Sequence, residues 1–212
     1  MSLDGFLDDA SEERLVLSNQ ADFDRVDAVR ASVDAIAVGA GTVRADDPGL
    51  LVRSEERRAE RAAAGKSESP LRVVFSPSGE LDPLARMFNG VGGPVVVYTS
   101  AVGAGTSALA APAVELVATG EREVDLAAAL ADLVDRGVAR LLVEGGGTMH
   151  SAFLSADVVD EVHLAVAPFL LGDQGGARFV YEAVFPQSPA SPLHLVEARA
   201  IGEVALLVYR RS

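Results

Sequence analysis

The stretch from Ala139 to Leu154 reads ARLLVEGGGTMHSAFL, and it decides the fold that the sequence predicts. An apolar run ends in three glycines, and apolar residues at helical spacing follow, which predicts a strand, a tight turn and a helix. Glycines without a Cβ let a ligand come close to the backbone. The first amides of a helix lack partners and lie at the positive end of its dipole, so they favour an anion. An ordinary glycine-rich turn has the same pattern, so the stretch alone leaves both interpretations open.

Composition limits the class of protein to which the chain can belong. Its 212 residues, 49% of them hydrophobic, are enough for one large domain with a full core, and we expect a single domain over residues 1–212. No apolar run approaches the roughly 18 residues of a membrane span. The formal net charge of −13 argues against a nucleic-acid partner. Without cysteine or a histidine pair at ligand spacing, we expect no metal site. The acidic start, Met1 to Gly5, is unlike a signal peptide and favours a cytoplasmic protein.

Hydrophobic patterns along the chain predict alternating helices and strands. A first helix is expected with Asp22 as its N-cap and Phe23, Val26, Val29 and Val33 on its buried face. Beside the run before the glycines, strands are expected over residues 34–39, 71–76, 94–100, 113–117 and 161–167. Further helical segments are expected as one turn at 42–45, a solvated helix or mobile excursion at 55–66, and an Asp125-capped helix that ends at Gly137.

The last two apolar segments, 193–199 and 204–210, flank Gly202 and predict an antiparallel hairpin. Strands that alternate with helices and end in such a hairpin predict a three-layer α/β/α fold. Its central sheet would be mostly parallel with an antiparallel edge.

A second group of polar residues follows the strand expected at 34–39. The first helix delivers Arg30, and the segment from Gly39 to Arg53 carries two glycines, Thr42 and the run Asp46-Asp47-Pro48. Ligands of open α/β sheets bind at the carboxyl ends of the strands, where this segment and Glu144 both lie. Arg30 and Arg53 could hold a phosphate from two sides through their planar guanidinium groups. Alternatively, both are surface charges that pair with Asp46 or Asp47.

Four parts of the chain together resemble the reductase domain of bifunctional riboflavin-biosynthesis proteins. They are residues 2–5, the segment from Arg30 to Arg53, the segment from Leu142 to Ala152, and Val159-Asp160-Glu161 with the later run 167–172. The resemblance extends over nearly the whole chain in order. It implies a dihydrofolate-reductase-like fold and a stand-alone reductase, since the deaminase half is not in this sequence.

The resemblance also implies a reaction and a set of site residues. The reaction is the NADPH-dependent reduction of the ribose of 5-amino-6-(5-phosphoribosylamino)uracil to ribitol. The implied substrate contacts are Arg30, Leu50, Arg53 and Glu144, with the arginines on the sugar phosphate. The implied cofactor contacts are Thr42, Asp46, Gly145, Gly146, Gly147, Thr148, Met149 and His150, of which the last five lie within a pyrophosphate-binding loop and helix start from Gly146 to Ala152.

The family chemistry is hydride delivery from the nicotinamide to C1′ of the sugar, which the cofactor supplies while the protein aligns the partners. The resemblance assigns no catalytic acid, and Asp46 is the candidate nearest to that role. Thr99 or Ser100, at the end of a strand, is a positional guess for the adenosine side. Two alternatives stay open: another pterin, folate, imine or carbonyl substrate on the same fold, or a nucleotide-binding module without turnover.

Departures from the family pattern concern the start of the chain. The family has an apolar strand before residues 2–5, so either the start is truncated or the sheet forms without that strand, and we expect that the true start lies upstream. Arg14 and Val16 stand where the family has a small polar residue and an aromatic residue. The family also implies a homodimer, and the apolar residues of the terminal hairpin are the contact candidates: Leu193, Leu195, Val196, Leu206, Leu207 and Val208.

Overall fold

A computed structural model of the chain describes residues 1–9, 11, 15–111, 113–172 and 175–211. The chain divides into two compact units. One consists of residues 1–26 and 146–212, and the other is the continuous segment 27–145. Helix α1 (Gln20–Ser32) runs through one boundary, and the glycine stretch contains the other.

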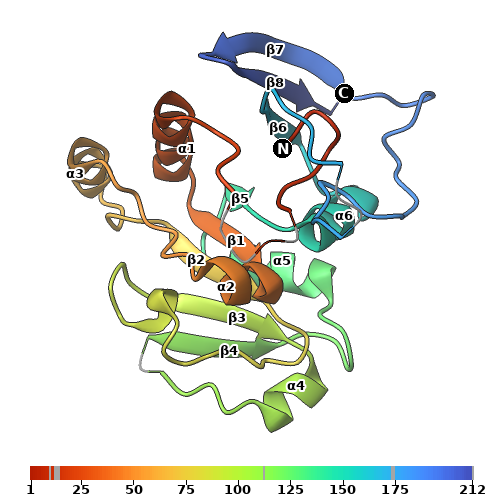
Figure 1. Cartoon of the computed structure of the whole chain (residues 1–212). Coiled ribbons are helices and arrows are strands. Elements are labelled where there is room, and N and C mark those ends of the chain that lie inside the picture. The colour runs from red at the N-terminus through yellow and green to blue at the C-terminus, as the bar shows by residue number, and fades with distance from the viewer. Residues whose placement is uncertain (10, 12–14, 112, 173–174, 212) are drawn as a thin grey trace. The chain divides into compact units, whose positions relative to one another are not determined.

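The unit of residues 27–145 is built on a parallel five-stranded sheet in the order β4-β3-β2-β1-β5 (Figure 1). The strands are β1 (Ala35–Gly39), β2 (Leu71–Phe75), β3 (Val95–Thr99), β4 (Val114–Ala118) and β5 (Leu141–Val143). Each strand pairs in parallel with its neighbours. All of β3 and most of β1 and β2 are buried, as expected of strands covered on both faces. The expected parallel sheet is confirmed.

Helices cover both faces of this sheet. Val38, Val74 and Val97 share one hydrophobic cluster with residues of α2 (Ala40–Asp46) and of the short helix η1 (Arg86–Phe88). The side chain after Val97 points to the opposite face. It is Tyr98, whose hydroxyl donates to Asp132 of α5 (Leu126–Asp135) at 2.6 Å. Helices on either face of one sheet make the predicted three-layer arrangement.

Local sequence signals explain where several helices begin and end. Asp125 accepts a hydrogen bond from the Ala128 amide at 3.0 Å, which makes it the predicted N-cap of α5, and Gly137 follows the helix at φ 84°. Ser100 caps α4 (Ala101–Thr106) in the same way through the Gly103 amide. The turn expected at 42–45 lies within α2, which ends where Asp47 takes a left-handed conformation.

The start of α1 differs from the prediction. The helix begins at Gln20, and its N-cap is Asn19, whose side chain accepts a hydrogen bond from the Asp22 amide at 3.0 Å. Asp22 therefore lies inside the first turn, where it pairs with Arg25. Phe23 was expected on the buried face, but it is 37% exposed. Both Asn19 and Asp22 are good capping residues, so the local sequence could not choose between them.

The segment expected as a solvated helix or a mobile excursion is a helix held in place, α3 (Glu55–Ala63). Ser54 caps it through the Arg57 amide. Arg61 is only 6% exposed. Its guanidinium donates to the carbonyl oxygens of Ala31 and Val33, each at 2.8 Å, and so caps the end of α1. The helix is confirmed, but it is anchored rather than loosely solvated.

The other unit contains the antiparallel sheet β6-β8-β7. Its strands are β6 (Glu161–Val166), β7 (His194–Ile201) and β8 (Val204–Arg210), and helix α6 (Gly147–Ser155) belongs to the same unit. The predicted hairpin of β7 and β8 turns at Gly202, with φ 59°. It does not extend the parallel sheet as an antiparallel edge. Instead, β8 pairs with β6, and the hairpin belongs to a sheet of its own.

One buried charge in the parallel sheet has no acidic partner among the described residues. Arg72 of β2 is fully buried, and its Nη2 donates to the Gly93 carbonyl oxygen at 2.5 Å. Its Nε and Nη1 have no hydrogen-bond partner in the described part of the chain. Burial accordingly lowers the pKa of Arg72.

Candidate active site

Three of the predicted site residues meet at the carboxyl edge of the parallel sheet. Because β1 and β5 are neighbours, Glu144 lies beside the end of β1, and its amide donates to the Ala37 carbonyl oxygen at 2.9 Å. A Cβ added to Gly145 would lie 3.1 Å from the Thr42 hydroxyl. Glu144, Gly145 and Thr42 therefore come together at the edge where parallel sheets bind their ligands.

Glu144 forms a bidentate ion pair with Arg30. Arg30 Nε lies 2.6 Å from Glu144 Oε1, and Nη2 lies 2.5 Å from Oε2. The two side chains are 15% and 16% exposed. Burial alone would lower the pKa of Arg30, but the hydrogen bonds and charge of Glu144 raise it above its ordinary value. The structure thus joins two predicted substrate residues to each other, and Arg30 pairs with neither Asp46 nor Asp47.

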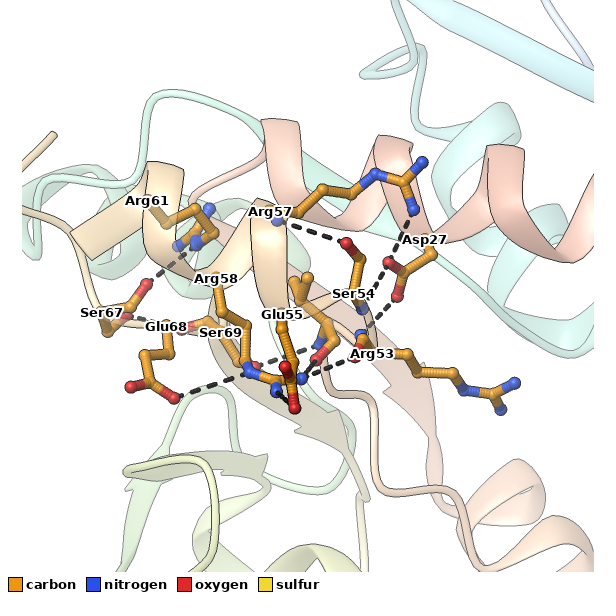
Figure 2. A network of polar contacts seen from close by, with 11 residues as sticks. Asp27, Arg53, Ser54, Glu55, Arg57, Arg58, Arg61, Ser67, Glu68 and Ser69 are labelled. Atoms are coloured by element: carbon orange, nitrogen blue, oxygen red, sulfur yellow. Dashed lines mark hydrogen bonds and ion pairs between the residues drawn. The ribbon is translucent and has the colours of Figure 1, made fainter. Parts of the chain in front are cut away.

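Arg53 has a different environment from Arg30. It is exposed, and its guanidinium has no partner among the described residues, while its backbone is fixed by Asp27 of α1. Figure 2 shows the Arg53 side chain pointing away from the surrounding polar network. Of the two arginines expected to hold a phosphate, Arg53 is therefore the one whose guanidinium is free to bind an anion.

The Asp27 carboxylate is the centre of that network. It accepts hydrogen bonds from the amides of Arg53 at 2.6 Å and Ser54 at 3.1 Å, and it forms an ion pair with Arg57 at 2.9 Å (Figure 2). Burial alone would raise the pKa of Asp27, but these three contacts lower it below its ordinary value. The carboxylate is thus ionised at neutral pH. Asp27 was not among the predicted site residues, although it stands three residues before Arg30, on the same side of the helix.

Leu50 and Asp46 lie on the segment between α2 and Arg53. Leu50 is 3% exposed and has φ 51°, a left-handed conformation that is strained for a leucine. Its side chain packs in the core, so the surface that it can offer a ligand is its backbone. Asp46 ends α2 and is exposed to solvent. Arg14, which stands where the family has a small polar residue, lies outside the described residues.

The glycine stretch presents a row of free amides. The amides of residues 145–149 donate to no acceptor in the described part of the chain, and Gly146 has φ 72°. Thr148 is exposed, whereas Met149 is 8% exposed and packs inward. These residues fit a bound anion such as a pyrophosphate, because unpaired amides at the start of a helix are its usual ligands. For Met149, only the backbone amide is suited to that role.

Two of the predicted loop residues also contact the segment 178–181. A Cβ on Gly147 would lie 2.1 Å from the Arg178 carbonyl oxygen, so only glycine fits there. His150 Nδ1 lies 3.0 Å from the Phe179 carbonyl oxygen. Burial lowers the pKa of His150, although that hydrogen bond opposes the change. His150 therefore holds this segment and is not a fully exposed helix residue.

Hydroxyl groups at the ends of β2 and β3 are mostly engaged within the protein. Thr99 and Ser100 both donate to the Pro77 carbonyl oxygen, at 3.1 and 2.8 Å, so the hydroxyls guessed for the adenosine side are already used. Ser76 is fully buried, and its hydroxyl has no partner among the described residues. Ser76 was not among the predicted site residues, although a hydroxyl directly after a strand at this edge is a usable signal.

The matching family model agrees with the resemblance seen in the sequence. The model for the RibD C-terminal domain matches residues 1–207. This chain belongs to the RibD C-terminal domain family. In the part of the chain that the structure describes, no helix could span a membrane, and no group of three or more possible ligating side chains is arranged to hold a metal ion.

Relatives of this RibD-family chain include archaeal reductases. The 2,5-diamino-6-ribosylamino-4(3H)-pyrimidinone 5′-phosphate reductase of Archaeoglobus fulgidus is 39% identical over 171 residues, which cover 81% of this chain and 78% of the relative. The enzyme of the same name from Methanothermobacter thermautotrophicus is 31% identical over 210 residues, which cover 99% of this chain and 94% of the relative.

A solved structure of the family has the same fold. It is the diaminohydroxyphosphoribosylaminopyrimidine deaminase/5-amino-6-(5-phosphoribosylamino)uracil reductase of Thermotoga maritima, with a TM-score of 0.80 and 25% identity. The match covers 100% of this chain and 54% of that protein, so this chain spans about half its length. The predicted dihydrofolate-reductase-like fold is confirmed.

Proposed function

We propose that this protein reduces the ribose of a ribosylamino-pyrimidine 5′-phosphate to a ribityl chain, using NADPH, in riboflavin biosynthesis. The observation that carries the proposal is the match to the RibD C-terminal domain over residues 1–207. Two features support it separately: the Arg53 guanidinium, which has no partner among the described residues, could bind a phosphate, and the amides of residues 145–149 offer ligands for a pyrophosphate.

The preferred substrate in this proposal is 2,5-diamino-6-ribosylamino-4(3H)-pyrimidinone 5′-phosphate. It is the compound in the names of both archaeal relatives, at 39% and 31% identity. The deaminated compound, 5-amino-6-(5-phosphoribosylamino)uracil, is the second candidate, since the Thermotoga maritima protein carries that name at 25% identity.

Each group of the site has a proposed part in binding. Arg53 binds the sugar phosphate through its guanidinium. Arg30 holds the Glu144 carboxylate, whose remaining lone pairs accept hydrogen bonds from substrate hydroxyl groups or from an exocyclic amine. Leu50 contacts the substrate through its backbone. These contacts align the sugar with the cofactor, which is the main task of the protein in hydride chemistry.

A reductase of this family uses a nicotinamide cofactor, and NADPH is our specific proposal. When bound, it supplies the hydride that adds to C1′ of the sugar. Thr42 and Asp46 would contact the bound cofactor, and the backbone of residues 145–149 would hold its pyrophosphate. We assign no general acid. Asp46 stays a candidate, and water or the substrate itself could supply the proton.

Turnover with purified protein tests this proposal. We expect oxidation of NADPH that depends on either phosphorylated pyrimidine, with a higher kcat/KM for the diamino compound and a lower kcat/KM with NADH. Higher kcat/KM for the uracil compound would make it the substrate. NADPH that binds but is not oxidised with either compound would instead favour a nucleotide-binding module without turnover.

We also propose a homodimer that forms through the terminal hairpin. Strand β7 supports this, because it is an edge strand of its sheet and exposes Leu195 and Val196 by 54% and 50%. Leu206 and Val208, which were also contact candidates, are buried within the unit. The cytoplasmic location stays a prediction.

A further inference from the structure

The loop that carries Arg53 is held by side chains and not by secondary structure. Residues 50–54 belong to no helix or strand, so their backbone polar groups need other partners. The amides of Arg53 and Ser54 donate to Asp27, and the Val52 amide donates to the Ser69 hydroxyl at 3.1 Å. The loop backbone is therefore fixed on its amide side by two residues, of which only Asp27 is charged.

The carbonyl groups of the same loop are bound by arginines. Arg58 Nη1 donates to the carbonyl oxygens of Val52 at 3.1 Å and Arg53 at 2.6 Å, and Arg30 Nη1 donates to that of Leu51 at 3.4 Å. The backbone of Arg53 thus has partners on both its amide and its carbonyl group, whereas its guanidinium has none among the described residues. Figure 2 shows this contrast between a bound backbone and a free side chain.

Such a backbone is prepared for a ligand before the ligand arrives. Ordering a loop during binding reduces affinity, and a loop that is already ordered avoids this loss. The 2.6 Å bond from the Arg53 amide to the buried Asp27 carboxylate fixes the residue whose side chain would hold the phosphate. Asp27 and Arg30 stand three residues apart on α1, so one face of this helix holds both the loop and Glu144.

We propose that Asp27 is a positioning residue for anion binding, which acts by fixing the backbone of Arg53 so that its guanidinium meets a phosphate monoester. The ligand class rests on the proposed function. Asp27 touches neither substrate nor cofactor in this proposal, and it acts through Arg53.

The direction in which Asp27→Asn changes anion affinity distinguishes a positioning role of Asp27 from a purely electrostatic one. Asp27→Asn removes a negative charge near the phosphate site and with it the ion pair between Asp27 and Arg57, so charge alone predicts tighter binding of an anion. Positioning predicts weaker binding, because the amide side chain replaces one of the two carboxylate acceptors with a donor. The two explanations therefore predict changes in opposite directions.

Asp34 provides a matched control. Its carboxylate also accepts two consecutive amides, those of Ala139 at 3.1 Å and Arg140 at 3.0 Å, and pairs with one cation, Lys66, at 2.8 Å. It stands directly before β1, at the opposite end of that strand from the site. Asp34→Asn therefore removes the same kind of contact without changing the loop that carries Arg53.

The experiment measures binding of ribose 5-phosphate by calorimetry, together with steady-state kinetics on the phosphorylated pyrimidine. For Asp27→Asn we expect about tenfold weaker binding of ribose 5-phosphate and a similar rise in KM, with little change in kcat. Asp34→Asn should change neither quantity. In an Arg53→Ala background, Asp27→Asn should have no further effect, because it acts through that side chain.

Several outcomes would overturn the inference. These are unchanged or tighter ribose 5-phosphate binding by Asp27→Asn, an equal loss in Asp34→Asn, an undiminished effect without Arg53, or a wild-type protein that does not bind ribose 5-phosphate. If Asp27→Asn does not fold, hydrogen exchange of the wild-type protein decides, since rapid exchange of the Arg53 and Ser54 amides contradicts a fixed loop. Wild-type protein that binds ribose 5-phosphate but reduces neither pyrimidine would overturn the proposed function and not this inference.

Discussion

At the scale of single residues, the two arginines of the site differ in what they already contact. Arg30 forms an ion pair with Glu144, whereas the guanidinium of Arg53 has no partner in the described part of the chain. A sequence shows two arginines at suitable positions, and only the folded chain shows which of them is free. The two should therefore respond differently to removal.

We expect Arg53→Ala to raise KM for the phosphorylated substrate by about 10–100-fold. This change corresponds to the loss of a charge-assisted hydrogen bond, which contributes about 1.5–3 kcal/mol. Its thermal stability should stay near that of the wild type, because the lost side chain is exposed and unpaired. Arg30→Ala should lose about 3 kcal/mol of unfolding free energy, because it leaves Glu144 without its partner. Kinetics and thermal unfolding of both variants measure these effects. A large loss of stability in Arg53→Ala at unchanged KM would contradict this assignment.

Asp4 lies in the unit that contains both ends of the described chain. Its carboxylate accepts hydrogen bonds from the Ser2 hydroxyl at 2.6 Å and from the amides of Leu171 and Gly172 at 3.1 and 2.7 Å. These bonds, with Ser2 foremost, lower the pKa of Asp4 from 3.8 to about 2. The folded state therefore binds the proton less readily than the unfolded state does.

A carboxyl group whose pKa is lower in the folded state than in the unfolded state stabilises the protein when the pH is above the unfolded-state pKa. This stabilisation is lost as the pH falls through the folded-state pKa. The contribution of Asp4 should thus be complete above pH 3.8 and disappear towards about 2. We expect the difference in unfolding free energy between wild type and Asp4→Asn to shrink over this range. Chemical denaturation at several pH values measures it, and a difference that stays constant would show that these hydrogen bonds do not act in solution.

At the scale of elements, the start of α6 depends on the close approach of residues 178–181. Gly147→Ala would place a methyl group 2.1 Å from the Arg178 carbonyl oxygen and 2.8 Å from Tyr181. Backbone cannot move aside cheaply, so we expect a loss of about 1–3 kcal/mol. Gly105→Ala in α4 is the control, because nothing lies within 4 Å of its new Cβ, and it should gain up to about 1 kcal/mol. Thermal unfolding compares them, and equal stability of the two variants would rule out the steric conflict.

Element types were predicted well because they follow from local patterns. The parallel strands, the Asp125 cap and the hairpin at Gly202 all lie where apolar runs and punctuating residues indicate. Adjacent strand ends also brought Glu144 and Thr42 to one edge, as expected of a parallel sheet.

Contacts between distant residues could not be predicted in the same way. The Arg30–Glu144 pair joins residues 114 positions apart, and the Arg61 cap of α1 spans 28–30 positions. No local pattern fixes which acid an arginine meets. The separate sheet of β6, β7 and β8 was missed for a related reason, because hydrophobic period identifies strands but not their partners.

At the scale of the whole molecule, the exposed edge strand β7 is the proposed site of self-association. A lysine on an edge strand opposes pairing with another strand. We expect Leu195→Lys and Val196→Lys to shift a dimer towards monomer, while Val184→Lys, at a site 90% exposed outside this sheet, should leave the dimer intact. Sedimentation velocity over a range of protein concentrations measures the shift. A monomeric wild-type protein would refute the proposed dimer.

The buried Arg72 has a consequence for how the thermal stability of this protein can be raised. A guanidinium that lies in the interior, with two nitrogens that have no partner among the described residues, is kept at a thermodynamic loss, which a methionine of similar length would avoid. Arg72 is the second residue of β2, and the ligand edge is at the other end of that strand. Replacement of Arg72 by methionine should therefore raise the thermal stability of the protein at a position remote from the candidate active site.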